Sequence, residues 1–320
     1  MRERASLLRR VATSQYAGLL LVLALLVLLF GSLSNHFASR VTLLTLANQV
    51  PALTLCAVGM TLVLIAAGID LSVGSVLALA ACVFAVVVTG PAWPLMLALA
   101  ASVFAGLMAG FVNGWISVRW RIPAFIVTLG MLEMARGGAY LITDSRSVYV
   151  GARLDAIGAP IAWLGVSPAF LVAVGLVVAA EVTLTRTVFG RYLVAIGTNR
   201  EAVRLSGVDP VSVEMAVFTI AGGLAGLAGV FHVAYLETAD PNAGIGLELS
   251  AIAAVVIGGT SLMGGRGSVV ASFLGVLIIA VLQAGLAQIG ASEPLKRIVT
   301  GVVIIAAVLI DAFRRERGAA

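Results

Sequence analysis

The chain has 320 residues, of which 61% are hydrophobic and 11% are charged. Soluble proteins carry about 25% charged residues, so this composition excludes a soluble globular protein and indicates an all-α, polytopic membrane protein. The net charge of +5 does not indicate nucleic-acid binding, because membrane topology accounts for arginines at the ends of apolar segments.

Apolar runs long enough to cross a hydrocarbon core of about 30 Å recur along the whole chain. We expect a single transmembrane domain over 17–312, with short tails at 1–16 and 313–320. The first span is expected to stay uncleaved, because no clear small-x-small cleavage site follows it. The ten expected spans are 17–34, 44–66, 72–89, 94–117, 123–142, 161–184, 213–235, 247–263, 268–289 and 295–312.

The basic residues predict the orientation. An even number of spans places both termini on one side. With the termini in the cytoplasm, fourteen arginines fall in inner segments and five basic residues fall in outer ones. Cytoplasmic loops carry the excess of Lys and Arg, so we expect both termini and the segment 186–212 to be cytoplasmic.

Polar residues interrupt the apolar pattern between the second and third spans. The stretch 66–75 contains Asp70, Ser72 and Ser75. An ionisable residue near the bilayer interior is costly and commonly functional, whereas a carboxylate just before a helix can also cap it. The residues favour neither interpretation over the other.

Two of the spans, 72–89 and 247–263, are short and rich in Gly, Ser and Ala. Such segments often belong to discontinuous helices that line a transport pathway, although two ordinary short helices in a tilted bundle would have the same pattern. We favour the discontinuous interpretation.

Glycines form two smooth helix faces. Their spacing lets helix backbones approach closely in lipid, so we expect packing rather than substrate contact. The two faces are Gly106, Gly110 and Gly114, and Gly222, Gly226 and Gly229.

The segment 186–212 is the longest polar stretch on the expected cytoplasmic side. Asn199 predicts a helix N-cap, Glu201 suits the first turn, Gly207 predicts the C-terminal end and Pro210 prevents continuation. A helix of about two turns is too short to be stable alone, so we expect it to dock on a partner. The apolar contacts would come from Ala202, Val203 and Leu205.

The chain offers no chemistry of its own. Lys296 is the only lysine and no P-loop motif is present, so ATP would be hydrolysed elsewhere. Cys56 and Cys82 lie in apolar runs and are expected to be buried small hydrophobes. His36 and His232 are isolated, without metal-ligand spacing. We therefore expect no enzyme activity, no metal site and no cofactor.

Six short motifs follow one another between about residues 45 and 312. They are Gly68–Ser75, Asn113-Gly114, Ile122–Gly130 with Arg136-Gly137, Gly197–Asn199 with Glu201–Gly207, Gly246–Ala254 and Ile257–Ser268. In this order they make the chain resemble the membrane-spanning permease subunits of bacterial ABC importers for ribose, xylose, galactose and related sugars.

This resemblance implies a multi-pass protein of the bacterial inner membrane that imports a monosaccharide. It implies three partners: cytoplasmic ATP-binding subunits, a periplasmic sugar-binding protein and a second permease copy. The expected substrate-path residues are Asp70, Ser72, Ser75, Asn113 and Thr128. The expected residues for coupling to the ATPase are Asn199, Glu201, Ala202, Arg204 and Gly207.

Other functions remain open at this point. A permease for branched-chain amino acids is closely related to the sugar permeases, and another small solute is also compatible. An ion-coupled secondary carrier would need acids deep inside its spans, and only Glu133 and Glu181 lie there. A membrane enzyme would need a catalytic constellation, and none is visible.

Overall fold

The computed structural model describes residues 15–34, 36–90 and 94–319, with side chains described except at 15, 307 and 310–319. The tail expected at 1–16 therefore lies almost wholly outside the described residues. The long elements are α2 (Gln15–Leu33), α3 (Arg40–Gln49), α4 (Pro51–Ile65), α5 (Val73–Thr89), α6 (Leu95–Trp120), α7 (Ala124–Ile142), α9 (Pro168–Arg186), α10 (Val188–Leu205), α11 (Pro210–Leu236), α12 (Leu247–Ile257), α13 (Val269–Gln288) and α14 (Glu293–Ala319).

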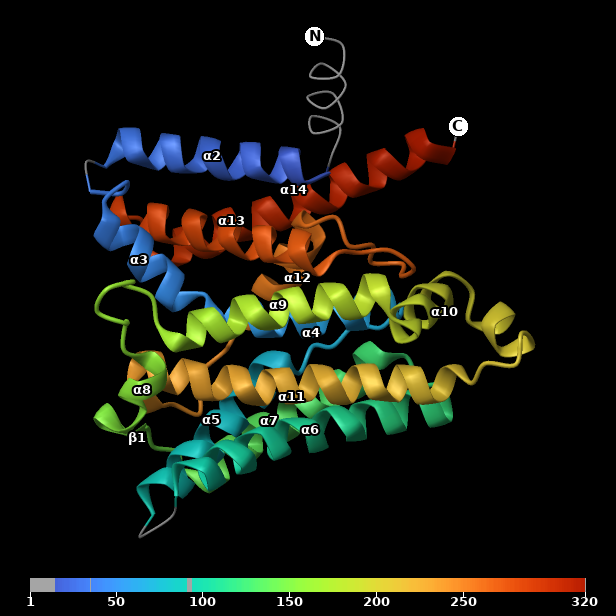
Figure 1. Cartoon of the computed structure of the whole chain (residues 1–320), viewed down its shortest axis with the longest axis horizontal. Coiled ribbons are helices and arrows are strands. Elements are labelled where there is room, and N and C mark those ends of the chain that lie inside the picture. The colour runs from blue at the N-terminus through green and yellow to red at the C-terminus, as the bar shows by residue number, and fades with distance from the viewer. Residues whose placement is uncertain (1–14, 35, 91–93, 320) are drawn as a thin grey trace.

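The short elements gather at one end of the helix bundle. They are β1 (Val148–Tyr149), η1 (Gly151–Leu154), α8 (Asp155–Gly158) and β2 (Thr238–Ala239). The two strands pair antiparallel, Val148 with Ala239. Figure 1 shows α8 and β1 at one end of the molecule and α10 at the other. The start of α2 and the end of α14 lie at the α10 end (Figure 1), so both ends of the described chain share one side of the bundle.

The centre of the bundle is formed by α4 and α11. Every residue of α4 except Leu53 is buried. In the most apolar stretch of α11, 67% of the residues are buried, compared with 22% in α7. The central helices are therefore covered by other helices, while α7 presents most of its surface outward.

The glycine faces pack α6 against α11, as expected. A Cβ on Gly110 would lie 3.0 Å from the Cα of Gly222, and one on Gly106 would lie 2.8 Å from the Cα of Gly226. Gly229 instead faces α5, where a Cβ would lie 2.6 Å from the carbonyl oxygen of Leu77. These contacts confirm that the glycines serve close packing.

The all-α membrane architecture is confirmed, but the count of ten spans is not. Six helices among the described residues are long and apolar enough to cross a membrane, or up to seven when the bent pair α3 and α4 is one span. The two meet at an angle of 48°. Pro51 opens α4, and because proline has no N–H it starts a new helix readily.

The expected span 72–89 matches α5 (Val73–Thr89) to one residue, but this helix is unbroken and the interruption lies before it. Two other expected boundaries were wrong. In 247–263 the helix stops at Ile257, because Gly259 at φ +82° leaves the helical conformation. In 161–184 the helix begins only at Pro168, after Ser167 as its N-cap.

Candidate substrate path and coupling segment

The break before α5 begins with a well-formed helix end. The amide of Ala67 donates to the carbonyl oxygen of Leu64 and that of Gly68 to Val63, each at 2.9 Å. This is the pattern of a Schellman motif. Ala67 occupies the left-handed position at φ +61°, where a Cβ costs about 1–2 kcal/mol relative to glycine.

Asp70 lies inside this break and is 1% exposed. Its Oδ1 accepts hydrogen bonds from the backbone N–H of Ser72 at 2.8 Å and from the Ser72 hydroxyl at 2.6 Å. The side-chain amide of Asn113, on α6, donates to the same hydroxyl oxygen at 3.0 Å. The donors therefore form one chain that ends on the Asp70 side chain.

Thr128, on α7, holds the backbone of the break from the other side. Its hydroxyl donates to the carbonyl oxygen of Ile69 at 3.2 Å and accepts from the N–H of Leu71 at 3.1 Å. Ser75 is buried in the first turn of α5. The structure thus links Asp70, Ser72 and Asn113 by hydrogen bonds, while Thr128 holds the backbone on both sides of Asp70 and Ser75 lies on the adjoining turn.

A closed gap, too small to hold a water molecule, adjoins these residues. Its lining residues are Asp70, Ser72, Val73, Val76, Gly110, Asn113, Gly222 and Ala225. The Oδ1 atom of Asn113 is buried without a hydrogen-bond partner among the described residues. Because a buried acceptor without a partner is costly, a donor that reached this oxygen after the gap opened would stabilise it.

The two acids within the expected spans have different surroundings. Glu181 on α9 accepts hydrogen bonds from the N–H groups of Val269 at 2.6 Å and Val270 at 3.2 Å. It therefore caps the N-terminus of α13. Glu133 is exposed at the middle of α7, and in the described part of the chain it has no hydrogen bond or salt bridge.

Arg136, which also lies within an expected span, donates hydrogen bonds from its guanidinium group to backbone carbonyl oxygens. Its Nη1 donates to the carbonyl oxygens of Pro241 at 2.5 Å and Ala243 at 2.7 Å. This arginine therefore fastens α7 to the loop that precedes α12.

The coupling segment contains two helices rather than one. The backbone of Asn199 is extended, at φ −157° and ψ 93°, and divides α10 into a first part and a short helix over 200–205. The Asn199 side chain accepts from the N–H of Ala202 at 2.9 Å, so the expected N-cap is confirmed. Gly207, at φ +85°, closes the short helix in a Schellman motif, with the amide of Val208 donating to Val203.

The apolar side chains of the short helix are divided between its two faces. Leu205 is 76% exposed and Ala202 is also exposed, whereas Val203 is 8% exposed and packs inward. The expectation that all three would meet a partner was therefore wrong for Val203, because its position at this helical spacing faces the bundle.

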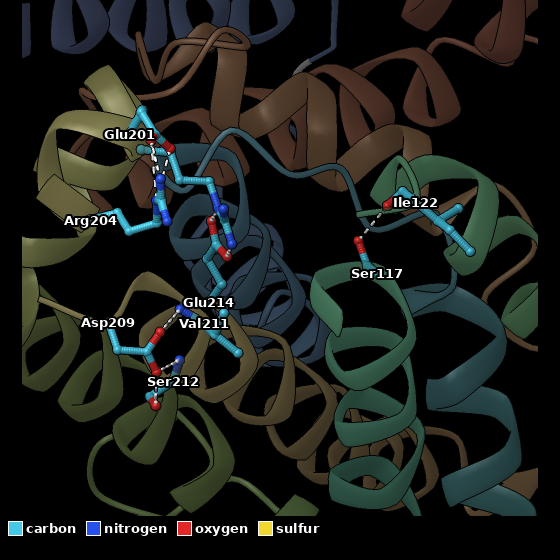
Figure 2. Close-up of polar contacts among 9 residues, drawn as sticks. Ser117, Ile122, Glu201, Arg204, Asp209, Val211, Ser212 and Glu214 are labelled. Carbon is cyan, nitrogen blue, oxygen red and sulfur yellow. Dashed lines mark hydrogen bonds and ion pairs between the residues drawn. The ribbon is translucent and has the colours of Figure 1, made fainter. Parts of the chain in front are cut away.

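Two charged pairs involve the short helix: one lies within it and the other joins it to α11 (Figure 2). Glu201 and Arg204 form an exposed pair at 2.5 Å, and these hydrogen bonds lower the pKa of the Glu201 carboxyl. Arg200 binds both carboxylate oxygens of Glu214 on α11, at 2.7 and 3.0 Å. Sequence analysis missed this bidentate pair, since the partners lie 14 residues apart on different helices.

Asp209 is the N-cap of the next helix, α11. Its carboxylate accepts from the N–H groups of Val211 and Ser212 and from the Ser212 hydroxyl, and the latter bond lowers the pKa of Asp209. Pro210 is therefore the first residue of α11, as well as the stop after the short helix. Figure 2 also shows the α6–α7 turn, which the Ser117 hydroxyl closes by donating to the Ile122 carbonyl at 2.9 Å.

Comparison with known proteins decides the family. The family described as "Branched-chain amino acid transport system / permease component" matches residues 42–308. The chain belongs to this family. It is accordingly a multi-pass protein of the inner membrane.

Several curated relatives are similar along nearly their whole length. The chain is 41% identical over 300 residues to the ribose import permease protein RbsC of Escherichia coli K12, covering 91% of this chain and 92% of the relative. It is 37% identical to RbsC of Bacillus subtilis, over 93% and 92% of the two chains. The fructose import permease protein FrcC of Rhizobium meliloti is 32% identical, over 93% and 85%. No solved structure matches the chain.

Among the described residues, no group of three or more His, Cys, Asp or Glu side chains could hold a metal ion. Cys56 and Cys82 are both buried and free, which confirms their expected place in the apolar interior.

Proposed function

We propose that this chain is the membrane-spanning permease subunit of an ATP-driven, binding-protein-dependent importer of a monosaccharide, a ribose-like pentose or a hexose. The observation that carries the proposal is the 41% identity to a ribose import permease over 91% of this chain. Relatives named for fructose, L-arabinose and D-allose support the same substrate class.

The energy source in this proposal is a separate cytoplasmic ATPase that docks on the short helix 200–205. The exposed Leu205 and Ala202 supply an apolar contact, and the Glu201–Arg204 pair supplies charges at its edge. The caps at Asn199 and Gly207 keep this small element folded, so docking need not first order it.

The substrate path in this proposal runs beside the cluster of Asp70, Ser72, Asn113 and Thr128, with Ser75 on the adjoining turn. A neutral sugar is recognised by hydrogen bonds, and the unpaired carbonyl oxygen of Asn113 can accept one from a sugar hydroxyl. The adjoining gap is too small to hold a water molecule, so the proposed cycle must open it from this closed state.

A second copy of the chain is the proposed partner within the membrane. Glu133 lies at the middle of α7 and is exposed, and a charged side chain at the centre of a span costs about 3 kcal/mol when it faces lipid. Gly130 and Gly137 leave open space on either side of it. Packing of two copies along α7 would place Glu133 in a polar path between them.

In the proposed cycle, a periplasmic binding protein delivers the sugar to the paired permeases. ATP binding closes the ATPase pair and moves the two copies between outward and inward access, and hydrolysis resets them. The ten expected spans and the cytoplasmic position of both termini belong to this proposal.

The family description names branched-chain amino acids, which makes an amino-acid permease the second candidate. Such a substrate carries a carboxylate, for which the path should offer donors. The cluster instead presents Asp70 and a free carbonyl oxygen, and both are acceptors suited to hydroxyl groups.

Co-purification with the cognate ATP-binding subunit tests the proposal. We expect the permease alone to hydrolyse no ATP, and the complex to hydrolyse ATP faster when a sugar-loaded binding protein is added. Stimulation by a leucine-loaded binding protein, without any by a ribose-loaded one, would support the amino-acid permease instead.

A further inference from the structure

Three segments that are distant in sequence meet at one backbone contact near the base of the short helix. The amide of Gly265 donates to the carbonyl oxygen of Ile65, the last residue of α4, at 2.9 Å. Gly197, in the last turn before the Asn199 kink, lies directly on this hydrogen bond. A Cβ at position 197 would overlap the Ile65 carbonyl oxygen and lie 2.5 Å from the Gly265 nitrogen.

Two further glycines complete the contact. A Cβ on Gly264 would lie 2.8 Å from the carbonyl oxygen of Gly197 and 2.8 Å from the Cβ of Ala67. A Cβ on Gly265 would lie 2.5 Å from the Thr198 hydroxyl oxygen. Both glycines have positive φ, +85° and +75°, which L-residues with side chains adopt only with strain. We call Gly197, Gly264 and Gly265 with Ile65 the glycine junction.

The glycine junction lies between the two candidate sites. On one side, Gly197 is two residues before Asn199, where the short helix begins. On the other side, Ile65 is five residues before Asp70, and the intervening chain contains the left-handed Ala67. A packed backbone has no soft side chain to absorb a displacement, because interiors at this density transmit strain.

The short helix is also held from its far side. The bidentate pair of Arg200 with Glu214 ties it to α11. The short helix is therefore joined to the bundle at two places, at the extended Asn199 next to Gly197 and through the Arg200–Glu214 pair.

We propose that the glycine junction positions the Asp70 break, by transmitting movement of the short helix through Gly197 and Gly265 to the end of α4. Gly197 and Gly265 are thus positioning residues for transport, and they act on Asp70 through Ile65. This inference rests on the proposed function, because it supposes that an ATPase moves the short helix.

Gly197→Ala tests the glycine junction in the assembled transporter. The new Cβ meets backbone at Ile65, which cannot move aside as a side chain could. We expect ATPase co-purification and basal hydrolysis to stay at wild-type levels, because the exposed face of the short helix is untouched. Sugar uptake and substrate-stimulated hydrolysis should fall about tenfold, within the usual range of coupling between sites.

Gly175→Ala is the matched control. Gly175 lies in α9, with nothing within 4 Å of an added Cβ, so this substitution should change neither uptake nor stimulation. Wild-type stimulation and uptake in Gly197→Ala would overturn the proposal. If the wild-type complex itself showed no substrate-stimulated ATP hydrolysis, the proposed function would be overturned, and this result does not depend on either variant.

Amide hydrogen exchange of the wild-type complex tests the same idea without a substitution, should Gly197→Ala fail to assemble. On trapping ATP in the ATPase, we expect exchange to change in both 200–205 and 66–72, while the Gly265 amide stays protected. A change confined to 200–205, or loss of protection at Gly265, would contradict transmission through the glycine junction.

Discussion

The buried polar side chains of this protein differ in how many hydrogen bonds they form. The Asp70 carboxylate accepts two hydrogen bonds from Ser72, whereas the carbonyl oxygen of Asn113 and the hydroxyl of Thr54 are buried without a partner among the described residues. The first group stabilises a particular backbone path. The other two groups are desolvated without a compensating hydrogen bond, which destabilises the closed structure.

Asp70→Asn should impair transport while leaving the fold intact. The amide oxygen can still accept from Ser72, but hydrogen bonds to a charged acceptor are stronger by about 1 kcal/mol than those to a neutral one. We expect normal membrane insertion and uptake reduced about tenfold, equivalent to ~1.4 kcal/mol. The measurement is radiolabelled sugar uptake, normalised to the amount of permease in the membrane.

Asp144→Asn serves as the control for this charge removal. Asp144 is exposed in a turn at φ +50°, which asparagine tolerates equally well. Its uptake should match the wild type. If Asp70→Asn also matched it, Asp70 would be left with a capping role alone.

Two buried threonines of α4 should respond differently when each is replaced by valine. The Thr54 hydroxyl has no hydrogen-bond partner within the described part of the chain, so Thr54→Val should leave the unfolding temperature in detergent unchanged or higher. The Thr61 hydroxyl donates to Ala57 and to Ser272 on α13, at 2.7 and 2.8 Å. Thr61→Val should cost about 0.5–1.5 kcal/mol. Equal unfolding temperatures for the two variants would contradict this assignment.

At the scale of elements, local signals predicted the short helix 200–205 well. Asn199 and Gly207 act at short range, through caps whose geometry depends on neighbouring residues, and both are confirmed. Two other features depend on where α11 packs: the Val203 side chain faces the bundle, and Arg200 pairs with Glu214. No pattern within 186–212 contains that information.

Glu201→Arg should weaken ATPase docking without unfolding the membrane domain. The substitution removes the exposed pair with Arg204 and places a third positive charge in the first two turns, opposite to the helix dipole. We expect less ATPase to co-purify with the permease, by about fivefold or more.

Glu293→Arg is the matched control for Glu201→Arg. Glu293 is also an exposed first-turn acid with an i,i+3 partner, the half-buried Lys296 at 3.2 Å, but it begins α14. Co-purification should be normal in this variant. Loss in both variants would indicate a general charge effect, and loss in neither would move the docking site to another loop, such as 118–122 or 263–268.

At the scale of the whole molecule, hydropathy predicted the class and the order of the helices but not the breaks. The bend at Pro51 and the early end of α12 fall inside segments that are apolar enough overall to be predicted as single spans. The glycine junction was beyond prediction for a different reason: its three segments are 67 to 200 residues apart, and their meeting depends on the full packing.

The orientation of the bundle can be tested by single-cysteine labelling after Cys56 and Cys82 are replaced. Thr198 and Trp163 are both exposed, and they lie in segments near opposite ends of the bundle (Figure 1). An impermeant reagent added to intact cells should label Trp163→Cys and spare Thr198→Cys. Labelling of position 198 from outside would reverse the proposed topology.

The most direct test of the account is sugar uptake into proteoliposomes that hold the permease with its ATP-binding subunit. The account predicts that labelled ribose or a related monosaccharide accumulates only when ATP is enclosed and a loaded binding protein is added outside. It also predicts that leucine does not accumulate. Sugar accumulation driven by an ion gradient without ATP, or ATP-driven accumulation of leucine in place of sugar, would contradict it.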